Sequence, residues 1–176
     1  MGREPGGECV RKRLLVALAS FALLAQPAFA QQGDEVVQFD SEDAAMNAAI
    51  EEARSTLPQF FGDFNAAPAS QRDGFMLKVG MPVEGGHEHI WVGSLHRENG
   101  QLIGELANEP NWMPGLHAGS RVVVDEALIS DWAIIASEGM YGSYTTRVML
   151  PYLEPNEAAQ VRAMLTRSPT PSHWSS

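Results

Sequence analysis

The sequence predicts an α+β domain, and three observations lead to that prediction. Apolar residues recur at helical spacing around Ile50, alternate with polar residues from Phe75 onward, and return to helical spacing after Pro155. Strands grouped together between helices at both ends are typical of the α+β class. We expect an N-terminal amphipathic helix on a twisted antiparallel sheet of five or six strands, which could curl toward a small barrel, and a short C-terminal helix.

Residues 1–30 have the composition of an export signal. A basic segment, residues 3–13, precedes the apolar run 14–24, and this run is too short to cross a hydrocarbon layer of about 30 Å. Residues 28–30 (Ala-Phe-Ala) fit the small-x-small pattern of a cleavage site. We expect cleavage after Ala30, no stable membrane anchor, and a mature protein that is periplasmic or secreted.

The charge of the mature chain excludes several classes of partner. Of 12 basic and 22 acidic residues, four and two lie in the signal, which leaves 8 against 20 and a net charge of −12. Nucleic acids and anionic lipids are bound through basic residues, so we expect neither as a partner. The single cysteine, Cys9, also lies in the signal, so the mature chain has no disulfide or thiol. We predict no cofactor.

The first helix is expected to follow a flexible segment, residues 31–40. Asp40 or Ser41 can cap it, and Pro58 disfavours helical geometry at Leu57, so the helix should stop or kink there. A small-residue loop is expected at 65–74. Three aromatic residues lie between, and we interpret them as a plug of the core, with pocket lining as the alternative: Phe60, Phe61 and Phe64.

A run of strands should follow this loop. The Gly85-Gly86 pair predicts one turn, and Asn99-Gly100 predicts a type I′ hairpin turn, because both residues adopt positive φ readily. Residues 108–117 read as an irregular loop. We expect strands at 75–81, 89–96, 101–106, 121–125, 134–136 and 144–150.

The last part of the chain is expected to be helical and then disordered. Asn156 can cap a helix that ends near Leu165. The residues expected to face inward are Val161, Met164 and Leu165. We therefore divide the mature chain into a single α+β domain, residues 41–166, and a disordered tail, residues 167–176.

His87 and His89 are the first candidates for a metal site. Residues i and i+2 of a strand share a face, but a site needs a third ligand, which only folding could supply. Histidine beside a glycine turn is also ordinary. The chain has no nucleophile elbow and no phosphate-binding glycine loop. We leave open whether it is an enzyme and favour a non-catalytic role.

The alternation predicts a second face of the sheet that could bind a partner. If Ile90 and Val92 face the core, His89 and Trp91 point to the opposite side. The same reasoning places Lys78, Thr145 and Arg147 outward. Trp and Arg are favoured anchors in interfaces, so this face is a candidate contact patch unless the C-terminal helix covers it.

Two irregular segments add polar residues beside aromatic ones. Asn108 and Glu109 follow the third strand, and Asp131-Trp132 lies between the fourth and fifth. Such residues either form turns or line a groove. The full set of binding candidates is Glu88, His89, Trp91, Asn108, Glu109, Asp131, Trp132, Tyr144 and Arg147.

Several motifs resemble those of a known family. The segments 88–92 (EHIWV), 104–110 (GELANEP), 129–132 (ISDW) and 142–145 (GSYT), with the helix 46–57, are similar in order and spacing to the YegJ-like family of bacterial exported domains. The resemblance covers about residues 40–150. It implies a small domain behind a signal peptide and carries no established activity.

We therefore expect a non-catalytic binding module for a protein partner or small ligand in the periplasm. One alternative is a metal-dependent enzyme that uses His87, His89 and nearby carboxylates. The other is an acidic inhibitor or immunity-type protein that neutralises a basic partner.

Overall fold

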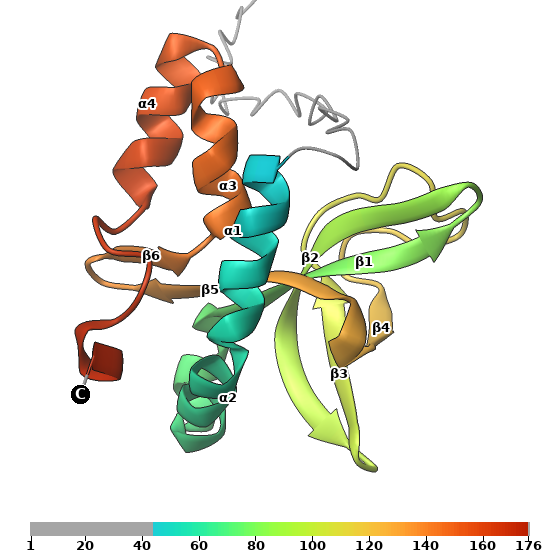
Figure 1. Ribbon diagram of the computed structural model, residues 1–176. Coiled ribbons are helices and arrows are strands. Elements are labelled where there is room, and N and C mark those ends of the chain that lie inside the picture. Colours follow the sequence, from blue (N-terminus) through green and yellow to red (C-terminus); the bar gives the residue numbers. More distant parts are fainter. Residues whose placement is uncertain (1–43, 176) are drawn as a thin grey trace, which may run out of the picture. The chain divides into compact units, whose positions relative to one another are not determined.

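The computed structural model describes residues 44–175 and has the α+β architecture that the sequence predicts (Figure 1). At its centre is an open six-stranded antiparallel sheet in the order β4-β3-β2-β1-β5-β6. The strands are β1 (Phe75–Val83), β2 (Gly86–Glu98), β3 (Gln101–Leu106), β4 (Arg121–Val124), β5 (Ile129–Ala136) and β6 (Gly139–Gly142). The export signal, the segment 31–40 and the proposed cap at Asp40 or Ser41 lie outside the described residues.

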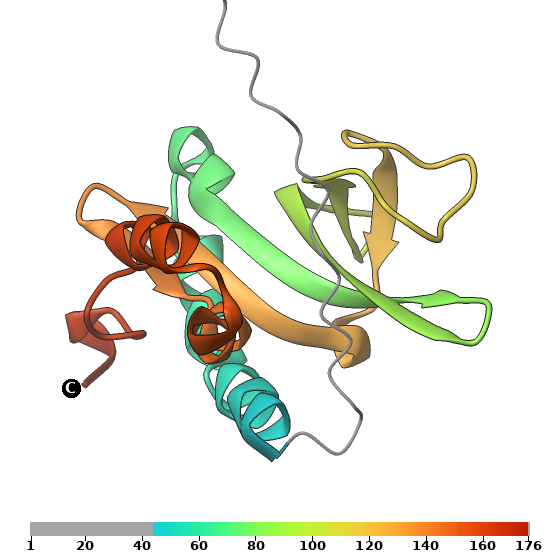
Figure 2. The ribbon, with the colours of Figure 1, turned by 90° about the horizontal axis from the view of Figure 1, so that it is seen from above.

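Two consecutive helices, α1 (Ala44–Ser55) and α2 (Leu57–Ala66), pack against one face of the sheet (Figures 1 and 2). The helix breaks beside Pro58, as predicted, but it resumes at once. Proline is accepted in a first helical turn because its missing N–H is not needed there. The loop predicted at 65–74 is wrong in detail, since α2 reaches Ala66 and a 3-10 turn, η1 (Ala69–Gly74), follows.

The aromatic residues of α2 close one end of the core, so the plug interpretation is confirmed. Phe60 and Phe64 are buried and Phe61 is partly buried. The ring of Phe60 lies 5.5 Å from that of Phe75 and 5.7 Å from that of Trp132, measured between centroids. Aromatic contacts of this kind add to the free energy gained by burying apolar area.

The three strands of the meander occur where the sequence predicts them, although β2 is longer at both ends. Gly85 has a φ of 86°, and Asn99 and Gly100 have φ values of 50° and 82°, as a type I′ turn requires. The register between β2 and β3 shifts between Gly93 and His96, where Ser94 also has a positive φ. This bulge lets the long strand bend.

The strand predicted at 144–150 is wrong, because these residues form a short helix, α3 (Tyr144–Met149). Positive φ values at Gly142 and Ser143 turn the chain out of the sheet. The buried carboxylate of Asp131 then accepts the first N–H groups of the helix. Tertiary contacts thus override the β-branched composition. The strand predicted at 134–136 is also too short, and the sixth strand is β6.

The last helix, α4 (Pro155–Met164), occurs as predicted, and Val161 and Leu165, both expected inside, are half-buried. Ala158 is buried, whereas Met164, expected inside, is 55% exposed. Residues 167–174, which were expected to be disordered, continue along β6 from Thr166 and end in a 3-10 turn, η4 (Ser172–Ser175). None of the helices in residues 44–175 combines the length and apolar composition needed to cross a membrane.

Candidate functional site

The two faces of the β1–β2 hairpin differ as the alternation predicts. Leu77, Val79, Ile90 and Val92 are buried in the core, and the β1–β2 register pairs them with each other. The intervening side chains belong to the opposite face, where His89 is exposed and Lys78 and Trp91 are half-buried. We call these last three residues the recognition face. The C-terminal helix α4 packs mainly against β6 and η3 (Leu150–Tyr152).

Lys78 and Trp91 form the centre of the recognition face. They are Cα partners in the β1–β2 register, and the ammonium group lies 5.8 Å from the centroid of the indole ring. The same ammonium group donates to the hydroxyl of Thr145, at 3.4 Å. A cation held over an aromatic ring has a defined position.

The imidazole of His89 is held by Ser130. Nδ1 lies 2.8 Å from Oγ of Ser130, and this hydroxyl also donates to the backbone oxygen of Lys78, at 3.3 Å. The β1–β5 register shifts here, and such bulges re-aim side chains. Gly80 makes room for the ring, because a Cβ there would lie 3.2 Å from its Cε1.

The protonation of His89 is biased by this placement. Burial of part of the ring lowers the pKa of His89 below its ordinary value, and the positive charge of Lys78 lowers it further. The neutral imidazole therefore leaves Nε2 as the ring nitrogen for a ligand. The hydroxyl of Ser130 is not comparably accessible, since this residue is only 4% exposed.

Asp131, a predicted binding residue, is fully buried and has a structural role. Its Oδ1 accepts from the N–H groups of Trp132 (2.8 Å) and Tyr144 (3.1 Å). Its Oδ2 accepts from the N–H (2.8 Å) and hydroxyl (2.6 Å) of Thr145. Burial raises the pKa of this carboxyl, and the hydrogen bonds and Lys78 oppose the rise. The group fixes α3 against β5.

Three further candidates are also parts of the fold. Trp132 is 0% exposed, and its Nε1 donates to the backbone oxygen of Ala53 (3.1 Å) and to Thr56 (2.9 Å). Tyr144 is buried with its ring 5.8 Å from that of Trp132. Arg147, expected outside on a strand, lies in α3 and donates to backbone oxygens of Gly142 and Thr166, both at 2.9 Å.

Glu88 and Glu109 shape the loop that links β3 to β4. The carboxylate of Glu88 is on the core side, 5% exposed, and accepts from the N–H groups of Asn111 (2.6 Å) and Trp112 (2.8 Å). Glu109 accepts from the N–H of Ala118 (3.0 Å), and this bond lowers the pKa of the exposed carboxyl. Asn108 makes only a long contact, 3.5 Å, with the backbone oxygen of Glu109.

The structure therefore brings together only part of the predicted set. His89 and Trp91 lie on one accessible surface, and Asp131 lies on the same face of the sheet, two strands from β2, but is buried. The remaining candidates are spread over the core and two loops. Sequence reasoning placed Lys78 and Thr145 outward but did not select them, and it missed Ser130. The polar pair Ser130-Asp131 inside an otherwise apolar strand was the available signal.

No group of three or more histidine, cysteine, aspartate or glutamate side chains that could hold a metal is found within residues 44–175. His87 and His89 stand two residues apart on β2 without a third ligand near them in this part of the chain. Nothing in the geometry favours the metal-dependent alternative.

Comparisons with known proteins name the family. A model described as "Uncharacterized protein conserved in bacteria (DUF2314)" matches residues 43–165. The chain is also 29% identical over 156 residues to "Uncharacterized protein YegJ" of Escherichia coli (strain K12), covering 89% of this chain and 99% of that protein. No solved structure matches it. The resemblance to YegJ-like proteins is confirmed, and the chain belongs to the DUF2314 family of bacterial proteins.

Proposed function

We propose that the chain is a non-catalytic binding module of the bacterial periplasm and that the recognition face is its contact surface. The observation that carries this proposal is the accessibility of Trp91 and Lys78 on a face whose reverse side is fully packed. Side chains on a sheet are held more rigidly than those on loops. Little conformational entropy is therefore lost when they bind.

The chemistry of the recognition face indicates the kind of partner. The ammonium group of Lys78 donates hydrogen bonds, neutral His89 offers Nε2, and the indole of Trp91 offers a flat apolar surface with one N–H. A protein segment that places an apolar side chain on the indole and a carboxylate or carbonyl oxygen beside the ammonium group fits this arrangement. Because the rest of the chain is acidic, this positive charge is confined to a small part of the surface.

The composition of residues 1–30 supports a periplasmic location. A protein that acts there meets its partner only after export, so the binding experiment is best done on chain produced with its own signal. Intact mass of this purified chain is expected to correspond to a start at Gln31.

Site-specific photo-crosslinking in living bacteria tests the proposal. We expect Trp91→p-benzoylphenylalanine to form a discrete adduct with one protein, because the new side chain lies on the recognition face. The matched control is Tyr152→p-benzoylphenylalanine, since Tyr152 is also aromatic and exposed but lies on η3. Adding Lys78→Gln to the first variant should abolish the adduct.

Two outcomes would contradict the proposal. Identical adducts at positions 91 and 152, or an adduct that survives Lys78→Gln, would show that the recognition face does not select the partner. Adducts that form at both positions and disappear as salt rises would favour the acidic inhibitor instead, because diffuse charge attraction is screened by salt.

A further inference from the structure

The C-terminal segment, residues 166–174, lies at the β6 edge of the sheet, and we call it the strap. It lies along the outer edge of β6, where the N–H of Thr166 donates to the backbone oxygen of Met140 (3.1 Å). The N–H of Gly142 donates to the backbone oxygen of Pro169 (2.7 Å), and an isolated parallel bridge joins Met140 to Leu165. The strap thus forms hydrogen bonds with backbone groups on the free edge of β6, as an additional strand would.

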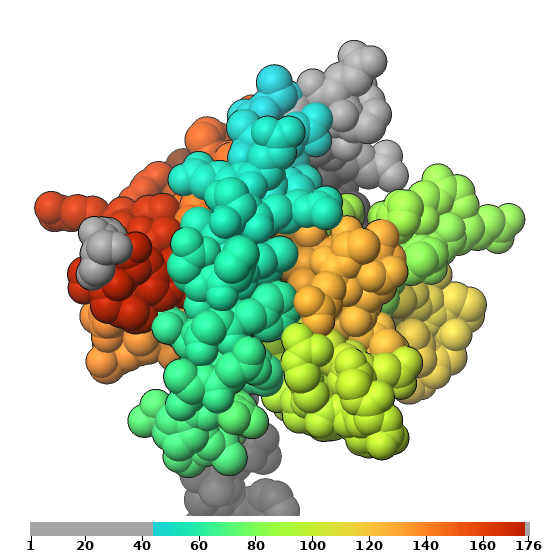
Figure 3. Space-filling view, turned by 60° about the horizontal axis from the view of Figure 1, so that its bottom comes forward, coloured from blue at the N-terminus to red at the C-terminus, as the bar shows by residue number. Residues whose placement is uncertain are grey.

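Side chains hold the two ends of the strap. At one end, Arg147 donates to the backbone oxygen of Thr166 at 2.9 Å. At the other end, the ring of Trp174 lies 5.0 Å from that of Trp132, and its Nε1 donates to Asp63 at 2.8 Å. Figure 3 shows this red end of the chain against the side of the cyan-green helices α1 and α2.

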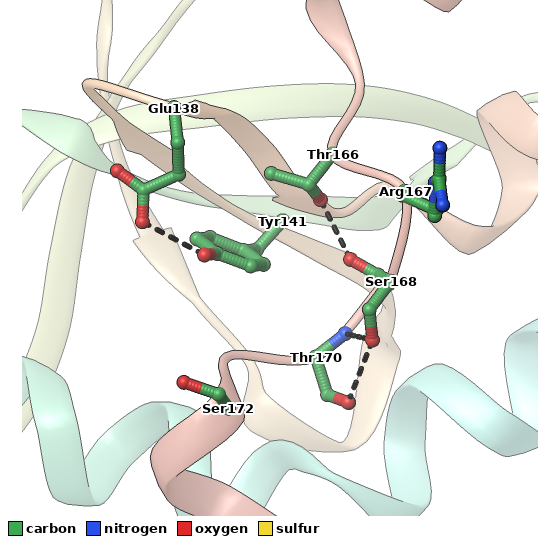
Figure 4. A pocket seen from close by; sticks show the side chains of 7 residues that line it. All are labelled: Glu138, Tyr141, Thr166, Arg167, Ser168, Thr170 and Ser172. Atoms are coloured by element: carbon green, nitrogen blue, oxygen red, sulfur yellow. Dashed lines mark hydrogen bonds between the residues drawn. The ribbon is translucent and has the colours of Figure 1, made fainter.

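Surface hollows remain on both sides of the strap. One lies between Tyr141 and Glu138 on the β6 hairpin and Thr170 and Ser172 on the strap (Figure 4). The other is lined by Asp63, Ile135 and His173, among others. The strap therefore borders both hollows.

The strap also stands outside the unit that defines the family. The family match ends at residue 165, immediately before the strap begins. The β6 edge, Arg147, Trp132 and Asp63 all belong to the matched part. The surface under the strap thus lies within the matched residues, and the strap lies outside them.

We propose that this surface is a peptide-docking groove and that an extended, proline-containing segment of another protein, with a tryptophan near its end, can take the place of the strap. The strap is then an internal competitor that shows the chemistry of the ligand. Main-chain bonds to β6 give affinity, and the pocket between Trp132 and Asp63 selects the tryptophan. Proline residues keep such a segment extended before it binds, which reduces the entropy lost.

Binding of a labelled peptide with the sequence of residues 165–176 to the full chain tests this inference. In the Trp174→Ala chain the strap no longer fills the aromatic pocket, so we expect at least about tenfold tighter peptide binding than to the unmodified chain. A control peptide with alanine in place of tryptophan should lose this gain. Equal binding of the two peptides, or no gain from Trp174→Ala, would overturn the proposal.

Amide hydrogen exchange of the unmodified chain gives a second test that needs no variant. The N–H of Gly142 bonds to the strap, whereas the neighbouring N–H of Ser143 bonds to the backbone oxygen of Trp132 on β5. If the strap opens by itself, Gly142 should exchange at least about tenfold faster than Ser143. Equal exchange would mean that the strap opens only when the domain unfolds, and the groove would not be available.

Discussion

The two strands of the β1–β5 pair use polar side chains in different ways. Lys78 and Asp131 are Cα partners on the same face of neighbouring strands, yet Lys78 is half-exposed and Asp131 is fully buried. Toward β2, Lys78 is joined by accessible Trp91 and His89. Toward α3, Asp131 is enclosed by the N–H groups that donate hydrogen bonds to its carboxylate. One face of one sheet therefore has an accessible half, around Lys78, and a half that is buried against α3, around Asp131.

This difference shows that polarity on the second face of a sheet does not by itself mark a binding site. A buried polar group is retained where its hydrogen bonds are complete, and its removal then affects stability. An accessible polar or aromatic group makes few such bonds, and its removal affects binding. The two halves can therefore be separated by paired substitutions.

The largest expected effect is on the tryptophan pair Trp132 and Trp91. We expect Trp132→Ala to lower the free energy of unfolding by about 3–5 kcal/mol, because it leaves a cavity in the aromatic core. Trp91→Ala, the matched control on the open half, should cost about 1 kcal/mol or less. Urea denaturation monitored by circular dichroism measures both. A comparable loss for both variants would place Trp91 in the core and remove the distinction.

A smaller but still large effect is expected for Asp131→Ala. This substitution leaves two N–H groups at the start of α3 and the hydroxyl of Thr145 without their acceptor, so we expect a loss of about 3 kcal/mol. Glu109→Ala is the control, because its carboxylate is exposed and the substitution should therefore cost much less. Thermal unfolding curves of the two variants and the unmodified chain give the comparison. Equal shifts in midpoint would contradict a folding role for Asp131.

The sequence predicts the fold class and the β1–β3 meander because the signals there are local. Alternation, the Gly85-Gly86 turn and the Asn99-Gly100 turn each act within a few residues. Residues 144–149 were assigned to the wrong class because their helix depends on Asp131, which lies on another strand. The docking of residues 166–174 depends likewise on β6 and Trp132, which no local pattern could indicate.

The recognition face was predictable only in part. Alternation places His89 and Trp91 on one side of β2, and this was inferred correctly from the sequence. The same rule applied to Arg147 fails, because the residue is helical. Glu88, which was expected to bind a partner, differs for another reason. Its carboxylate lies on the core side and accepts hydrogen bonds from two loop N–H groups. A buried carboxylate with distant partners leaves no pattern in the sequence.

The smallest effect concerns the pH dependence contributed by His89. Its pKa in the folded chain lies below the ordinary histidine value because of partial burial and the nearby charges of Lys78 and His87. Below the ordinary value the unfolded chain binds a proton that the folded chain does not. The stability contributed by neutral His89 is therefore present above that value and is lost as the pH falls toward the folded pKa.

Replacing His89 by glutamine isolates this contribution. Because every other group titrates alike in both chains, the free energy of unfolding should fall more steeply between about pH 7 and pH 5 in the unmodified chain than in His89→Gln. Titration of the His89 ring proton signal by NMR measures the pKa directly and should place it below that of the unfolded chain. Parallel stability curves would mean that burial and the charge of Lys78 do not hold the imidazole neutral, and the recognition face would then carry an imidazolium.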